Sequence, residues 1–135
     1  MGQISEMKIL LIAFIALIIS FQAYSTEKSI KHKVVPDIVS MDEAKAVFAK
    51  TTSQLQGLTI LDEAELHDVH MITYSLEKAV AYFVDNMIGG DTEMAAKMAE
   101  LVELVHIASE NNNAVETKNH LADYFEIAGD FEQRL

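Results

Sequence analysis

The sequence predicts an all-α protein, an antiparallel up-down four-helix bundle, and three observations support this fold class. Apolar residues recur at alternating spacings of three and four beyond residue 40, which is the period of one face of an α-helix. No segment shows the alternation with period two that a half-buried β-strand requires. Short breaks rich in glycine or asparagine separate the helical segments, and connections of this length make successive helices antiparallel neighbours.

Residues 1–25 are expected to be a cleaved secretory signal peptide rather than part of the fold. Lys8 precedes an apolar run, Ile9 to Phe21, that is shorter than the ~20 residues of a bilayer span. Ala23-Tyr24-Ser25 fits the small-x-small rule for cleavage. Translation from Met7 would give a more typical leader, and an uncleaved anchor is the alternative. We therefore predict a periplasmic protein with no stable membrane insertion after cleavage.

The composition narrows the classes of function. The chain has 21 Asp and Glu against 10 Lys and Arg, a net charge of −11 at pH 7, so we expect it to bind no nucleic acid. Its acidity would attract cations or a basic envelope protein partner, although acidity also keeps a small exported protein soluble. The chain has no cysteine, which excludes disulfides, covalent haem attachment, thiolate zinc sites and a cysteine nucleophile.

Residues 26–39 are predicted to be a flexible tether, because they contain the only proline and show no helical period. Residues 40–135 are predicted to form the bundle domain. Its first and shortest helix begins at Ser40, where S-M-D-E is a capping box in which Ser40 and Glu43 satisfy free backbone amides. Gly57 ends this helix, and its apolar face consists of Val47, Phe48, Thr51 and Leu55.

The second helix is predicted from Asp62, an N-cap with a glutamate three residues later, to about Ile88. Spacings of three and four define its apolar face over three heptads, which is typical of a bundle. The residues of that face are Leu66, Val69, Thr73, Leu76, Val80, Phe83 and Met87.

Gly89-Gly90 ends the second helix, and Asp91 is expected to cap the third. The run of asparagines at 111–113 ends the third helix, and the fourth occupies the residues that follow, with a fraying end near Gly129. Three methionines fall on apolar positions and are predicted to fill gaps in the core rather than to bind Cu(I). They are Met87, Met94 and Met98.

A stripe of polar side chains borders the apolar face of each of the two central helices, and we call the two stripes together the His/Glu seam. Helical spacing places the members of each stripe on one side of their helix. In an antiparallel hairpin about Gly89-Gly90, His70 is level with Glu110, and Glu77 with Glu103. The spacing leaves open whether both stripes face the same side of the hairpin. The seam comprises Glu63, His67, His70, Tyr74 and Glu77 on the second helix, and Glu103, His106 and Glu110 on the third.

Two interpretations of the seam compete if the stripes share a side. In the first it is structural, a set of histidines satisfied by neighbouring polar groups, with Tyr74, His70 and His106 as its members. In the second it binds Zn, Cu or Fe. The candidate metal ligands are His70, His106, Glu77, Glu103, Glu110 and His67.

More elaborate centres fit the sequence less well. Only Glu103-x-x-His106 matches the motif of di-iron bundles, which need two such motifs and two further glutamates. Non-covalent b-type haem, with His106 or His120 and a methionine as axial ligands, is a further alternative.

The sequence contains no motif of an enzyme active site. Helical Ser75 and Ser109 lack an oxyanion turn, and the only glycine pair breaks a helix rather than forming a phosphate loop. We therefore predict no catalytic residues and no enzyme activity.

Three segments resemble a family of small exported bacterial proteins whose domain has no assigned function. They are MDEAKAVFAKTTSQL, LHDVHMITYSLEKAV and LVELVHIASE, within residues 40–110. The resemblance implies a periplasmic helical protein but assigns no activity to it. It also implies a shared polar set of His70, Tyr74, Glu77, His106 and Glu110.

The expected function is therefore that of a non-enzymatic binding or structural protein with a His/Glu seam and no cofactor. The first alternative is a bundle that binds a divalent metal or b-haem at the seam. The second alternative is an envelope accessory protein that docks a basic partner.

Overall fold

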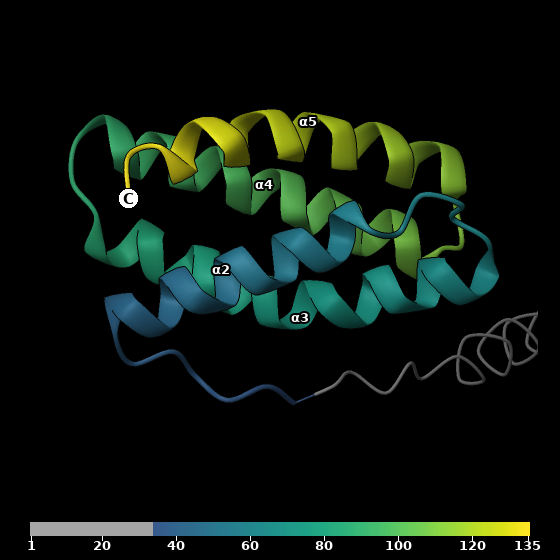
Figure 1. Cartoon of the computed structure of the whole chain (residues 1–135), viewed down its shortest axis with the longest axis horizontal. Coiled ribbons are helices and arrows are strands. Elements are labelled where there is room, and N and C mark those ends of the chain that lie inside the picture. Colours follow the sequence, from purple (N-terminus) through teal and green to yellow (C-terminus); the bar gives the residue numbers. More distant parts are fainter. Residues whose placement is uncertain (1–33) are drawn as a thin grey trace, which may run out of the picture. The chain divides into compact units, whose positions relative to one another are not determined.

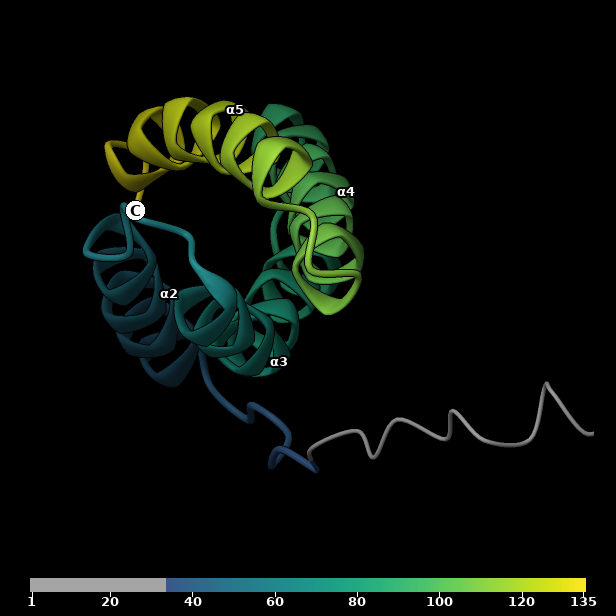
Figure 2. The ribbon, with the colours of Figure 1, turned by 90° about the vertical axis from the view of Figure 1, so that its right-hand side faces the viewer.

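The computed structural model describes residues 34–135, so the predicted signal peptide and residues 26–33 of the predicted tether lie outside the described residues. The described residues form four α-helices and no strand: α2 (Met41–Gln56), α3 (Glu63–Asn86), α4 (Gly90–Glu110) and α5 (Ala114–Glu132). Successive helices run in opposite directions (Figure 1), and they follow one another around a ring when viewed along the bundle (Figure 2). The predicted all-α class is confirmed. In the described part of the chain, no helix combines the length and the apolar character needed to cross a membrane.

The helices begin where local capping chemistry places them. The Ser40 hydroxyl accepts a hydrogen bond from the backbone N–H of Glu43 (3.1 Å), and the Glu43 carboxylate accepts one from the N–H of Val39 (3.0 Å). The side chains of Asp62 and Asn113 cap α3 and α5 in the same way. These caps satisfy amides that would otherwise lack partners in the first turn, which confirms the predicted start of α2 and the predicted cap of α3.

The turn between α3 and α4 differs in detail from the prediction. Asp91 does not cap α4, because Gly89 is its N-cap and contributes no side-chain hydrogen bond. Gly89 has φ 63° and ψ −140°, a conformation that is essentially restricted to glycine. Helix α3 ends at Asn86, slightly before the predicted Ile88, since Met87 is already extended. Gly129, predicted to fray, lies inside α5.

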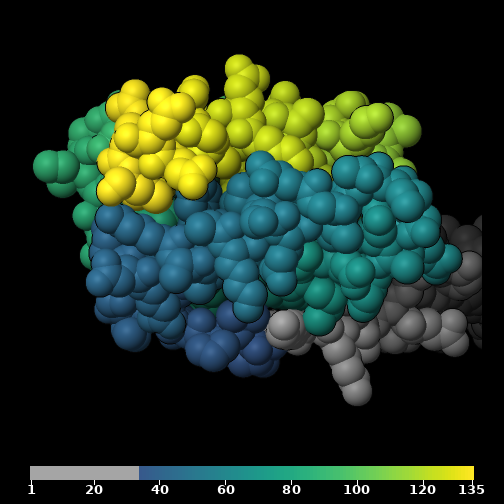
Figure 3. Space-filling view, viewed as in Figure 1, coloured from purple at the N-terminus to yellow at the C-terminus, as the bar shows by residue number. Residues whose placement is uncertain are grey.

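The core joins the first helix to the last through aromatic side chains. The ring of Phe48 on α2 packs edge-on against Phe83 of α3 and Phe131 of α5, with centroids 5.7 and 5.8 Å apart. The hydroxyl groups of Thr52 on α2 and Tyr124 on α5 form a hydrogen bond of 2.7 Å. The surfaces of α2 and α5 accordingly adjoin in the space-filling view (Figure 3). These contacts close the ring of helices.

The methionines predicted to fill gaps pack in or against this core. Met98 of α4 is fully buried. Met87 and Met94, on either side of the α3–α4 turn, are partly buried and pack against the other apolar residues. A flexible thioether side chain suits such irregular spaces.

Gly89→Ala is expected to destabilise the protein by about 1–3 kcal/mol, because a Cβ is strained at this positive φ even though the space around it is open. Gly90 is the matched control. It is the first residue of α4, a Cβ there also meets open space, and Gly90→Ala should be neutral or stabilising by about 0.4–1 kcal/mol. Chemical denaturation followed by circular dichroism measures both. Equal effects of the two substitutions would contradict the role assigned to Gly89.

Candidate functional site

The two stripes of the His/Glu seam share one side of the α3–α4 hairpin, which answers the question that the spacing left open. The rings of His70 on α3 and His106 on α4 contact each other edge to face, with centroids 4.6 Å apart. The Tyr74 ring packs against both, at 5.2 Å from the His70 ring and 5.0 Å from the His106 ring. Both histidines are buried, with exposed fractions of 8% and 7%. Their geometry is therefore set by the packing of the two helices.

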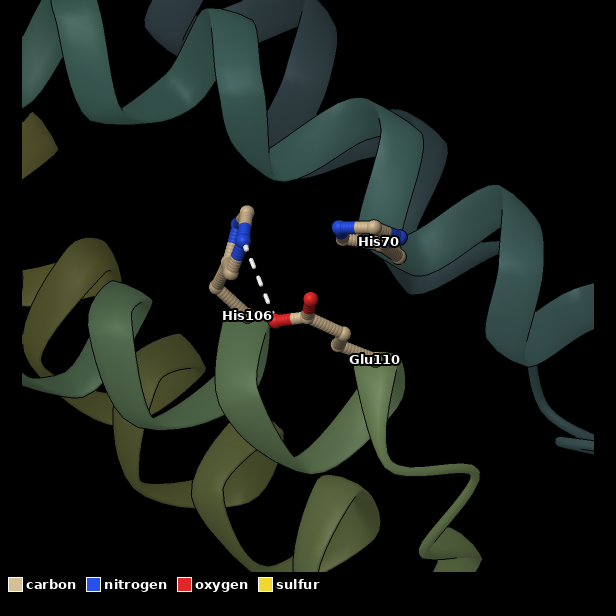
Figure 4. A group of neighbouring side chains, drawn as sticks. All are labelled: His70, His106 and Glu110. Atoms are coloured by element: carbon tan, nitrogen blue, oxygen red, sulfur yellow. Dashed lines mark ion pairs between the residues drawn. The ribbon is translucent and has the colours of Figure 1, made fainter. Parts of the chain in front are cut away.

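Three residues of the seam direct metal-ligating atoms into a common space. One atom each of His70, His106 and Glu110 lies within 4.8 Å of the other two. Figure 4 shows the His70 side chain of α3 facing the other two, which come from α4. Nε2 of His106 is 3.8 Å from Oε2 of Glu110. Because donors bound to one ion are roughly 3–3.5 Å apart, small side-chain rotations would close this group on an ion.

The hydroxyl of Thr73 determines which nitrogen of His106 carries the ring proton. It donates to the backbone carbonyl of His70 (2.6 Å), and a hydroxyl has only one proton to donate. The same oxygen is 2.9 Å from Nδ1 of His106, so it accepts a hydrogen bond from Nδ1–H. The lone pair of the ring is then on Nε2, the nitrogen nearer to Glu110. Metal-binding histidines are typically held by a hydrogen bond of this kind from the nitrogen that does not bind the metal.

Glu77 and Glu103 form a pair of carboxyl groups near Nδ1 of His106. Oε1 of Glu77 is 3.1 Å from Nδ1, but it is buried and accepts no hydrogen bond within residues 34–135, because Nδ1–H is directed at Thr73. Burial raises the pKa of Glu77 to about 7, and the charge of Glu103 and a hydrogen bond with its carboxyl add to this effect. Glu77 therefore gains and loses its proton near neutral pH.

The structure brings together only three of the six predicted metal ligands, His70, His106 and Glu110. Glu77 and Glu103 form the carboxyl pair instead, and His67 is exposed on α3 outside the converging group. His120 of α5, the other candidate for haem, is half-buried and also lies outside that group. The rings of His70 and His106 are in contact, so no porphyrin fits between these two rings; haem held by His106 or His120 with a methionine stays a prediction.

Thr73 is a residue of the candidate site that the sequence analysis did not identify as one. Its spacing assigned it to the apolar face of α3, and it is indeed fully buried there. Its hydroxyl nevertheless contacts His106, which is 33 residues further along the chain. A buried hydroxyl beside a polar stripe must find partners, and that requirement was the available signal.

A cleft between α2 and α3 is lined by no residue of the His/Glu seam. Its volume is about 650 Å³, and its walls combine apolar side chains with Lys50, Thr51 and Asp68. This volume would suit a small ligand, but no histidine lines the cleft. The seam therefore remains the candidate site.

Comparison with known proteins identifies a family but no characterised relative. The model of a Family of unknown function (DUF6746) matches residues 4–133. No curated protein and no solved structure matches the chain significantly. The family match confirms the predicted resemblance to a domain without an assigned function. It also extends well beyond residues 40–110, over which the motifs were recognised.

Glu77→Gln is expected to stabilise the protein at pH 8 by about 1–3 kcal/mol and to have little effect at pH 5. The pKa of Glu77, about 7 in the folded state, exceeds the ordinary 4.5, so the wild-type protein loses stability as the pH rises from about 5 through 7. The substitution removes this ionisation. Urea denaturation at both pH values measures the effect, and exposed Glu100→Gln is the control. A gain that is the same at both pH values would contradict the raised pKa.

Proposed function

We propose that this chain, which belongs to the family of unknown function DUF6746, is a non-enzymatic exported protein that binds one divalent transition-metal ion between α3 and α4. The proposal rests on the metal-ligating side chains of the His/Glu seam. The ligands of the ion are His70, His106 and Glu110. The observation that carries the proposal is the convergence of these three donors, from two helices, within 4.8 Å. Imidazole and carboxylate donors suit zinc, copper and iron.

The surroundings of His106 support the proposal. Histidines bound to metals almost always donate their second ring N–H to an acceptor, which fixes the tautomer and the ring orientation. The Thr73 hydroxyl accepts that bond here, and the Glu77 carboxyl lies 3.1 Å from the same nitrogen. Because the ring is buried, little conformational freedom would be lost when an ion binds.

The electrostatics of α4 also support a cation at this place. The helix ends at Glu110, and its last turn contains no basic side chain. The partial negative charge at the C-terminus of a helix favours a bound cation within about one turn; Glu110 lies in the last turn of α4, and His106 lies one turn before it. The net charge of −11 raises the concentration of cations near the protein.

A structural seam without an ion is the second candidate. Tyr74 Oη lies 3.1 Å from Nε2 of His70, and Thr73 satisfies Nδ1 of His106, so both rings have hydrogen-bond partners from the protein. The remaining alternative, that the protein docks a basic envelope partner, is supported only by the net charge of −11. Export is proposed from the leader at residues 1–25, which lies outside the described residues.

The wild-type protein, purified without an affinity tag and stripped with a chelator, is expected to bind one equivalent of Zn(II) or Cu(II) in isothermal titration calorimetry. His106→Ala should abolish this binding, because it removes the imidazole held by Thr73. His120→Ala is the matched control and should bind as the wild type does. An ion at 100 times its Kd should also stabilise the wild type by about 2.7 kcal/mol.

Glu110→Gln separates loss of binding from loss of folding. Glu110 is at the rim of the seam, with 20% of its side chain exposed, so its replacement should leave the fold intact. We expect at least tenfold weaker binding, because the anionic ligand is lost. If the wild type binds neither ion, or if both variants bind as tightly as the wild type, the proposal is wrong and the seam is structural.

A further inference from the structure

The phenol of Tyr74 is a fourth oxygen or nitrogen donor that the proposed site does not use. Its Oη is 3.1 Å from Nε2 of His70. That separation lies within the roughly 3–3.5 Å expected of two donors bound to one ion. The Tyr74 ring also packs edge to face on the ring of His106. The phenol oxygen is therefore at ligand distance from one proposed ligand, and its ring contacts a second.

The four side chains form a regular pattern on the hairpin. His70 and Tyr74 are one turn apart on α3, and His106 and Glu110 are one turn apart on α4. The helices are antiparallel, so each imidazole of one helix lies level with an oxygen donor of the other. Along the hairpin, His70 is thus level with Glu110 and Tyr74 with His106, so residues of like donor type are diagonally opposite in the register of the two helices.

Resting on the proposed function, we propose that Tyr74 is the fourth ligand of the ion and that this set of two nitrogens and two oxygens selects Cu(II) over Zn(II). When Cu(II) binds, the phenol releases its proton to solvent, and the bond from oxygen to copper replaces the O–H bond. The phenolate and the Glu110 carboxylate then neutralise the two positive charges of the ion. Neutralisation favours a site between two imidazoles that are both buried.

The chemistry of the donors carries the choice of ion. Tetragonal sets of nitrogen and oxygen donors are typical of Cu(II) or Ni(II), and Cu(II) has the highest affinity among the divalent first-row ions. Zinc sites in proteins use cysteine, histidine and carboxylate ligands and are almost always tetrahedral when closed. A set of two imidazoles, one carboxylate and one phenolate, without a thiolate, therefore favours copper.

Titration of the chelator-stripped full chain with copper sulfate tests the inference. The wild type should develop a visible phenolate-to-copper charge-transfer band that saturates at one equivalent. Tyr74→Phe should lose this band and bind Cu(II) at least tenfold more weakly in competition with a chelator, while its Zn(II) affinity should change less than threefold. Tyr82→Phe, which alters a partly buried tyrosine on the same helix, is the matched control and should keep both the band and the affinity.

The other outcomes are distinguishable. If Tyr74→Phe keeps the wild-type spectrum and affinity, or binds copper more tightly because the phenol had competed for His70, the inference is wrong and the three-ligand site stands. If the wild type binds neither Cu(II) nor Zn(II), the proposed function itself fails. If Tyr74→Phe does not fold, resonance Raman spectroscopy of the wild-type copper complex tests the phenolate ligand without the variant. Phenolate ring modes enhanced in the charge-transfer band would support the inference, and their absence would overturn it.

Discussion

The backbone of Gly89 is the constraint on which the His/Glu seam depends. Its positive φ reverses the chain between α3 and α4 within three residues, Met87 to Gly89. A connection this short sets the register of the two helices, so residues at similar distances before and after it are level. The contact of Thr73 with His106 follows from this register, as does the pairing of Glu77 with Glu103.

The bundle accommodates a polar seam because its apolar and polar contacts are segregated. The phenylalanine cluster and the bond between Thr52 and Tyr124 connect α2 and α5 across the core, whereas the seam occupies the groove between α3 and α4. Burying two imidazoles and a threonine hydroxyl would cost several kcal/mol if they lacked partners, and here the described contacts satisfy them. Oε1 of Glu77 is the buried oxygen that accepts no hydrogen bond among the described residues. Burial of this carboxyl, with the charge of Glu103 beside it, raises its pKa.

The parts of the fold that depend on local chemistry were predictable from the sequence. The caps at Ser40 and Asp62 and the antiparallel order of the helices require only nearby residues, and the register of the hairpin follows from its short turn. The start of α4 was wrong, because Asp91 resembles a cap whereas Gly89 acts through its backbone and has no side chain to indicate it. The leader and the periplasmic location stay predictions.

The side of the hairpin that the stripes face could not be predicted. It depends on how far each helix rotates about its own axis, and all the core side chains together determine that rotation. The role of Thr73 was hidden for a related reason. Periodicity assigns a residue to a face, but it does not identify the partner that a hydroxyl on that face will meet across the groove. The convergence of His70, His106 and Glu110 is thus a property of tertiary packing, although each residue was a candidate from its type and spacing.

The connectivity of the bundle also has a consequence for the order in which the protein folds. Contacts between neighbours in the chain form early because they close short loops, and folds rich in them reach the native state in microseconds to milliseconds. The bond between Thr73 and His106 spans 33 residues, whereas the bond between Thr52 and Tyr124 spans 72. The seam therefore assembles with the α3–α4 hairpin, before α2 and α5 meet and close the ring. A transient opening in which α2 detaches would leave all three converging donors in place.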